Sequence, residues 1–107
     1  MGAAWALFLS GKQPEAVAAV VDFYGTGETD LARARAAYQC HFADPDDWEP
    51  LEGVRAMAAA MQAAGREVTL HLYPGAGHWF FEADRPEAYK PAEADLAWRR
   101  TVEFLRR

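Results

Sequence analysis

Segments with strand-like and helix-like patterns alternate along this chain, and their order constrains the fold more than any other feature of the sequence. Residues 67–73 alternate apolar and polar side chains, as in a β-strand with one buried face. Residues 50–64 place their apolar side chains on one helical stripe, and Gly65 follows where a helix commonly ends. A helix of this length before a strand predicts a right-handed crossover in a parallel sheet.

Four further segments complete the expected order of elements. Residues 2–9 are Ala-rich and apolar on most sides, which predicts a buried helix that ends near Gly11. Residues 16–23 form a valine-rich run that predicts a strand buried on both faces, and residues 37–42 predict a second short strand. Residues 91–105 predict the last helix. Its packed face is expected to consist of Ala94, Trp98, Thr101 and Leu105. The sequence therefore predicts an α/β fold with three parallel strands and flanking helices.

The composition excludes several classes of protein. A chain of 107 residues with 51% hydrophobic residues can form one domain with a real core. Its net charge is −5, and its basic residues are scattered except near the end of the last helix, so we expect no nucleic acid partner. Residues 2–9 are too few to span a membrane, and they lack the basic start of a signal peptide. We therefore expect a cytoplasmic protein with no membrane partner.

A glycine-rich loop carries the most informative side chain. Residues 73–82 read Tyr-Pro-Gly-Ala-Gly-His-Trp-Phe-Phe-Glu, which places His78 directly after a predicted strand. In an open parallel sheet, the loops that follow the strands meet at one edge, where such proteins place their reactive groups. His41 and His71 fall inside predicted strands, so we expect them to be packed rather than reactive.

A second loop supplies carboxylates to the same edge. The segment at 43–47 reads Ala-Asp-Pro-Asp-Asp and follows the preceding predicted strand. One of these aspartates beside His78 would fix the imidazole tautomer and stabilise the imidazolium, while the histidine acts as a general base. The order of acid and then histidine also agrees with α/β-hydrolases, in which the nucleophile precedes both. The spacing of these groups fits no closed metal site, so no metal is expected.

Three segments in this order resemble the dienelactone hydrolase family of α/β-hydrolases. They are Asp-Phe-Tyr-Gly at 22–25, His-Phe-Ala-Asp-Pro-Asp-Asp-Trp-Glu-Pro at 41–50, and Tyr-Pro-Gly-Ala-Gly-His-Trp-Phe at 73–80. The resemblance implies that residues 1–107 are the C-terminal half of this fold, with the N-terminal half missing. It also implies a hydrolase that cleaves an ester or lactone through a Ser/Cys–His–Asp triad, without a cofactor.

The resemblance assigns roles to individual residues. Asp46 corresponds to the catalytic acid and His78 to the general base, with Asp44 as the alternative acid. Residues 1–5 resemble the turn after the nucleophile, so Met1 corresponds to the residue whose backbone N–H helps to hold the oxyanion.

The nucleophile of the triad is expected to be absent from this chain. Ser10 is the only serine and lies well downstream of the nucleophile position. Cys40 is the only cysteine and falls inside a predicted strand, where a buried thiol is inert. We therefore expect little or no hydrolase activity from the chain alone.

The substrate side of the site departs from the family. Dienelactone hydrolases carry an arginine four residues after the histidine, where it holds a substrate carboxylate, and this chain has Glu82 there. The resemblance therefore does not imply dienelactone as the substrate. Trp79 and Arg85 are the expected substrate-binding residues.

A truncated, non-catalytic hydrolase-like module is the alternative. The strand expected at 16–23 would present an open apolar edge, and such an edge pairs with another chain or aggregates. The alternative thus predicts a homo-oligomer that forms through the sheet edge, or a chain that binds a partner.

Overall fold

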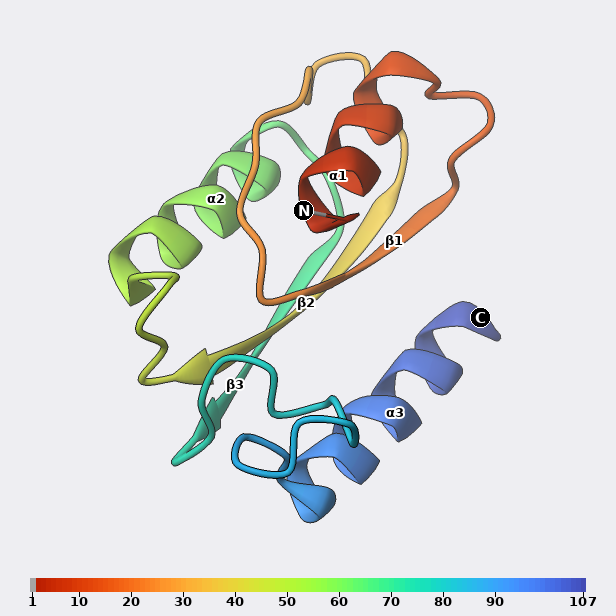
Figure 1. Ribbon diagram of the computed structural model, residues 1–107. Helices are drawn as coiled ribbons and strands as arrows, with labels where there is room; N and C mark the ends of the chain where they lie inside the picture. The colour runs from red at the N-terminus through yellow and green to blue at the C-terminus, as the bar shows by residue number, and fades with distance from the viewer. Residues whose placement is uncertain (1) are drawn as a thin grey trace.

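Helices and strands follow one another in the order that the sequence pattern predicts. The protein is described by a computed structural model, which covers residues 2–107. The elements are α1 (Gly2–Lys12), β1 (Ala19–Phe23), β2 (Ala37–Asp44), α2 (Leu51–Ala63), β3 (Val68–Pro74) and α3 (Pro91–Leu105). The strands form one parallel sheet in the order β1-β2-β3. Figure 1 shows α1 and α2 on one face of this sheet and α3 on the other. The expected α/β architecture with three parallel strands is confirmed.

The carboxyl ends of the three strands lie at one edge of the sheet. Phe23, at the end of β1, is in register with His41 of β2. Asp44, at the end of β2, is in register with Pro74 at the end of β3. The loops after all three strands therefore leave the sheet on the same side, which is where the sequence places its candidate functional groups.

β2 is the central strand, and helices cover it on both faces. Residues 38–43 are all buried. A strand in this position is expected to be a continuous buried run. On the side of α3, the polar pair Gln39 and His41 is joined by a hydrogen bond of 2.8 Å. The core on the side of α1 and α2 includes Leu7, Val20, Tyr38, Cys40, Phe42, Val54 and Met61.

α2 buries one stripe and ends as its sequence predicts. Val54 and Met61 are buried on its inner side. After the last turn, the Arg66 N–H donates to the Met61 carbonyl. The Gly65 N–H donates to the Gln62 carbonyl, and Gly65 has a φ of 80°. This pair of hydrogen bonds is a Schellman motif, which requires the left-handed conformation that glycine adopts without strain.

α1 is less buried than its composition suggests. Leu7, Ser10 and Gly11 are buried, but Trp5 is 61% exposed and Phe8 is 45% exposed. A helix that is apolar on most sides has no pattern that selects one face, and within residues 2–107 only the inner side of α1 meets the sheet. The expectation of a buried helix is therefore wrong for the outer side of α1.

The expected burial of β1 is also wrong. The strand begins at Ala19 rather than at residue 16, and buried residues alternate with more exposed ones along it. Val20 and Asp22 are buried, whereas Ala19 is exposed. Among residues 2–107, β1 pairs only with β2, so it is an edge strand and not a strand buried on both faces.

α3 has the predicted bounds but packs through a different face. Ala94 and Thr101 are buried as expected, but Trp98 is 56% exposed and Leu105 is 59% exposed. Ala97 takes the central position and packs near Tyr73 and Phe80. A small side chain lets the helix approach the sheet closely, whereas a tryptophan at that point would hold it away. The other buried residue of this face is Phe104.

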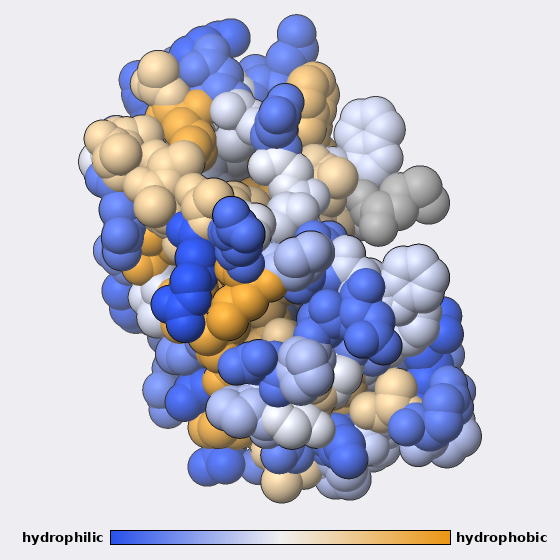
Figure 2. Space-filling model, turned by 90° about the vertical axis from the view of Figure 1, so that its left-hand side faces the viewer, coloured by the Kyte–Doolittle hydropathy of each residue, from blue (hydrophilic) through white to orange (hydrophobic). Residues whose placement is uncertain are grey.

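The outer surface carries mostly polar groups on the side shown in Figure 2. Hydrophilic residues cover much of this face, and they interrupt the apolar areas between them. No helix within the described part of the chain is long and apolar enough to cross a membrane.

Candidate active site

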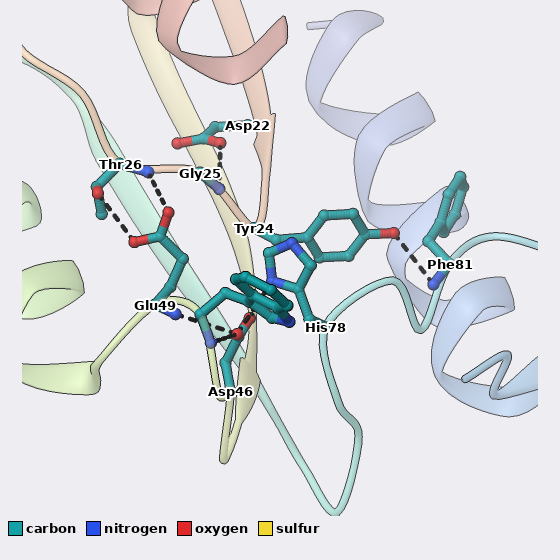
Figure 3. Close-up of polar contacts among 9 residues, drawn as sticks. Asp22, Tyr24, Gly25, Thr26, Asp46, Glu49, His78 and Phe81 are labelled. Atoms are coloured by element: carbon teal, nitrogen blue, oxygen red, sulfur yellow. Dashed lines mark hydrogen bonds and ion pairs between the residues drawn. The ribbon is translucent and has the colours of Figure 1, made fainter. Parts of the chain in front are cut away.

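Three loops bring their side chains together at the carboxyl edge of the sheet. Tyr24 follows β1, Asp46 follows β2 and His78 follows β3. Figure 3 shows the side chains of Tyr24 and Asp46 next to the imidazole of His78. The parallel strands thus convert three distant segments of sequence into one cluster.

Asp46 and His78 form the central contact of this cluster. Asp46 Oδ2 lies 2.7 Å from His78 Nδ1, and Oδ1 lies 3.0 Å from the same nitrogen. The Asp46 side chain is 0% exposed and the His78 side chain is 16% exposed. An ionised carboxylate only accepts hydrogen bonds, so Nδ1 must carry the proton and Nε2 is left as the basic nitrogen.

The backbone of its own loop holds the Asp46 carboxylate in place. Oδ1 accepts hydrogen bonds from the backbone N–H groups of Trp48, at 2.8 Å, and Glu49, at 3.1 Å. These bonds orient the carboxylate so that Oδ2 is directed at the histidine (Figure 3). Asp44, the alternative acid, is the last residue of β2, and its backbone carbonyl accepts from the Gly75 N–H. The structure brings Asp46 to His78.

Aromatic rings enclose the imidazole of His78. The ring centroid of Tyr24 lies 4.9 Å from that of His78, and the centroid of Trp79 lies 4.7 Å from it. Tyr24 and Trp79 both have left-handed backbone conformations, with φ values of 53° and 68°. Such conformations cost a non-glycine residue of order 1–3 kcal/mol, and surrounding contacts must hold them.

Tyr24 also connects two of the three loops. Its hydroxyl oxygen accepts a hydrogen bond of 3.2 Å from the Phe81 N–H, which ties the end of β1 to the histidine loop. Burial raises the pKa of Tyr24, and the nearby charge of Glu82 raises it further. The phenol therefore stays neutral and serves as a fixed wall of the site.

An open pocket of about 660 Å³ lies in front of His78. Trp79, one of the two expected substrate-binding residues, lines it. Arg85, the other, does not belong to the lining. Its guanidinium stacks over the Trp79 ring at 4.1 Å from the centroid and lies 3.8 Å from the Glu82 carboxylate. The lining consists of Gly2, Ala3, Ala4, Phe23, Tyr24, Gly25, Thr26, Trp48, Glu49, His78, Trp79, Phe81 and Glu82.

Neither Ser10 nor Cys40, the only serine and the only cysteine of the chain, belongs to the lining of this pocket. Ser10 is fully buried, donates to the Leu7 carbonyl at 2.6 Å and contacts the Tyr38 hydroxyl at 2.6 Å. Cys40 is fully buried, and burial raises the pKa of its thiol to about 12. Met1, the expected oxyanion-hole residue, lies outside the described residues.

The other histidines take structural positions. His41 is fully buried, with Nδ1 2.7 Å from the Tyr73 hydroxyl and Nε2 2.8 Å from Gln39 Oε1. Burial lowers the pKa of His41 to about 3, so it is neutral. Burial also lowers the pKa of His71, which stacks on His41. Among residues 2–107, no group of three or more histidine, cysteine or acidic side chains is placed to hold a metal ion.

Sequence reasoning assigned no role to two acidic residues at this edge. Glu49 accepts hydrogen bonds from the backbone N–H of Thr26, at 3.3 Å, and from its hydroxyl, at 2.9 Å, and so joins the acid loop to the loop after β1. Asp22 is 1% exposed and accepts from the Gly25 N–H at 3.2 Å. Its Oδ2 has no hydrogen-bond partner among the described residues, and burial raises its pKa to about 7. The only sequence feature that distinguishes Asp22 is that an aspartate occurs inside a valine-rich predicted strand.

Known proteins match both the sequence and the fold. The family model "Dienelactone hydrolase family" matches residues 1–107. A protein named "Probable 2-oxo-3-(5-oxofuran-2-ylidene)propanoate lactonase" from Bradyrhizobium sp. is 33% identical over 119 residues, which cover 99% of this chain and 47% of the relative. "Protein usf" from Aquifex pyrophilus is 27% identical over 108 residues, which cover 98% of this chain and 47% of the relative.

A solved structure supports the fold assignment. The crystal structure of a "Putative Dienelactone Hydrolase" from Klebsiella pneumoniae superposes with a TM-score of 0.75 at 22% identity, over 91% of this chain and 45% of that one. The present chain spans about half the length of the curated relatives that it matches. With a family model that matches its whole length, this chain belongs to the dienelactone hydrolase family.

Proposed function

We propose that His78 and Asp46 are the base and the acid of a hydrolase that cleaves a carboxylic ester or lactone. One observation carries the proposal. The fully buried Asp46 carboxylate lies 2.7 Å from His78 Nδ1, beside a pocket that His78 lines. This is the arrangement that a general base needs, because the carboxylate fixes the tautomer and leaves Nε2 for proton transfer.

The proposed reaction has two stages. In the first, His78 Nε2 takes a proton from a serine or cysteine nucleophile, which attacks the carbonyl carbon, and the imidazolium then protonates the leaving alcohol. In the second, His78 takes a proton from water, whose oxygen attacks the acyl-enzyme; the bond to the nucleophile then breaks, the imidazolium returns the proton to the serine or cysteine, and the acid is released. Asp46 keeps its charge throughout and stabilises the imidazolium. We place the nucleophile outside the described residues, because Ser10 and Cys40 are both buried away from the pocket.

The lactone substrate class rests on a relative. The Bradyrhizobium protein is named as a lactonase, and a lactone is a cyclic ester that the same steps would open. For the present chain we therefore propose only the type of bond that is cleaved. The side chains that line the pocket would determine which ester binds.

A fusion tests the proposal. The part of the Bradyrhizobium relative that this chain does not match would be joined ahead of Met1, and hydrolysis of p-nitrophenyl acetate would be measured for the fusion and for the 107-residue chain. We expect turnover by the fusion and little by the chain alone. His78→Ala and Asp46→Asn should each reduce turnover by the fusion by about 10³-fold or more.

Controls separate chemistry from folding. Circular dichroism and size-exclusion chromatography would establish that the fusion and its variants fold alike. His71→Ala is a matched control, because His71 lies in β3 and outside the pocket lining. A folded fusion whose turnover survives His78→Ala would refute the proposed role.

A further inference from the structure

We propose that the pocket in front of His78 takes an ester that carries a positive charge, such as a quaternary ammonium group, and discriminates against one that carries a carboxylate. The inference rests on the proposed function, since it names the class of ester that the same site would bind. Three observations carry it: the acidic groups of the lining, the aromatic groups around them, and the position of Arg85.

The lining is acidic. Glu49 and Glu82 both belong to it, and among the described residues the lining includes no lysine or arginine. Glu49 accepts its hydrogen bonds from the neutral donors of Thr26 and makes no ion pair within residues 2–107. Glu82 shares its charge with Arg85, whereas the charge of Glu49 is not offset by an ion pair in the described part of the chain, so the lining as a whole repels an anion and attracts a cation.

Aromatic side chains line the same pocket as these carboxylates. Trp48 and Trp79 lie with their ring centroids 5.8 Å apart, and Tyr24 and Phe81 complete the lining on the side of the histidine loop. The faces of aromatic rings attract cations through their quadrupole, and tryptophan does so most strongly. Rings of this kind next to carboxylates are the chemistry that recognises a quaternary ammonium group.

Arg85 is the cation that an anionic substrate would need, and it is already engaged. Its guanidinium lies over the Trp79 ring, and it pairs with Glu82 at 3.8 Å. To bind a substrate carboxylate, Arg85 would have to leave both partners and enter a pocket that Glu82 lines. Arg85 thus occupies one face of the Trp79 ring, as a cation does on an aromatic face.

Three ligands of similar size and different charge test the proposal. Acetylcholine carries the positive charge, 3,3-dimethylbutyl acetate is its neutral counterpart, and 4-acetoxybutanoate carries a carboxylate. Their binding to the 107-residue chain would be measured by NMR, from the shifts of the tryptophan indole and His78 ring signals at low salt. We expect acetylcholine to bind at least 5-fold more tightly than the neutral ester and at least 10-fold more tightly than the anion.

Variants connect this preference to the two carboxylates. Glu82→Gln should reduce the preference for the cation over the neutral ester several-fold, and Glu49→Gln should do the same if the first variant does not fold. Glu87→Gln is the matched control, since Glu87 is an exposed residue of the same segment outside the lining, and it should leave the preference unchanged. The preference should also fall as salt is raised.

The outcomes are distinguishable from those of the fusion experiment. Equal binding of the three ligands, tighter binding of the anion, or no detectable binding of acetylcholine would each overturn the inference. The proposed function would survive these results as long as the turnover of p-nitrophenyl acetate by the fusion depends on His78. Loss of that dependence would instead refute the function, whatever the order of binding.

Discussion

Asp22 makes the stability of this protein depend on pH in a direction that is unusual for an aspartate. Burial raises its pKa from 3.8 to about 7, and the charge of Glu49 contributes to the shift. Between these two values the unfolded chain has lost the proton and the folded chain still holds it, so rising pH favours unfolding. The cost grows from pH 3.8 upward and is complete above pH 7.

The magnitude follows from the difference between the two pKa values. One unit of pKa corresponds to about 1.4 kcal/mol, so a pKa near 7 implies a penalty of about 4 kcal/mol above that pH. Asp22→Asn removes the ionisation and keeps an oxygen that can accept from the Gly25 N–H, which lies 3.2 Å away. We expect the variant to be more stable than the parent by about 2–4 kcal/mol at pH 8 and to lose this advantage at pH 4.

Urea unfolding at pH 4, 6 and 8 would measure this difference. The parent also contains His41, whose pKa is lowered to about 3, and this group acts in the opposite sense by weakening the fold as pH falls from 6.5 towards 3. Only the difference between variant and parent therefore isolates Asp22. Asp84→Asn, at an exposed aspartate, is the control and should show no such trend. An advantage for Asp22→Asn that is the same at all three pH values would refute the reasoning.

Two further predictions concern packing and association. Gly25→Ala should destabilise the fold by about 1–3 kcal/mol, because the new Cβ would lie 2.3 Å from the Ala3 Cβ. Gly53→Ala should instead stabilise α2 by about 0.5–1 kcal/mol, because its new Cβ would have no atom within 4 Å. Thermal unfolding would measure both variants, and equal effects would contradict the reasoning. The exposed apolar side of α1 next to the edge strand β1 should make the chain self-associate, and Phe8→Glu should weaken that association. Sedimentation velocity would reveal it, and a monomer at high concentration would argue against it.

The sequence predicted most of the fold because the element ends carry local signals. α3 runs from Pro91 to Leu105 as expected, since proline fits the first turn of a helix. The packed faces of α1 and α3 were predicted less well, because apolar content alone does not decide which side meets the sheet. Trp98 has the hydrophobicity of a core residue, but the helix can approach Tyr73 only through the small side chain of Ala97.

The candidate site was also predicted only in part from the sequence. The two loops could be found in the sequence, because parallel strands send their ends to one edge. The resemblance favoured Asp46 over Asp44 as the partner of His78, but the strand pattern alone did not exclude Asp44, because it predicted that the strand ends at residue 42. β2 runs through Asp44, so that residue stays within the strand, and Asp46 is free to turn back towards His78. Arg85 was expected to face the substrate, and its stacking on Trp79 is a tertiary contact without a local signal.

The hydrogen bonds of Asp46 to its own loop give one side chain two tasks. Oδ2 holds the imidazole, while Oδ1 folds the turn that carries Trp48 and Glu49 into the pocket wall. An alanine at position 46 would therefore release the turn as well as the histidine, and both rate and ligand selection would change. An asparagine can still accept from the two N–H groups, so it preserves the wall and reverses only the histidine tautomer. In the proposed mechanism, one carboxylate therefore fixes both the basic histidine and the pocket wall that would contact the substrate.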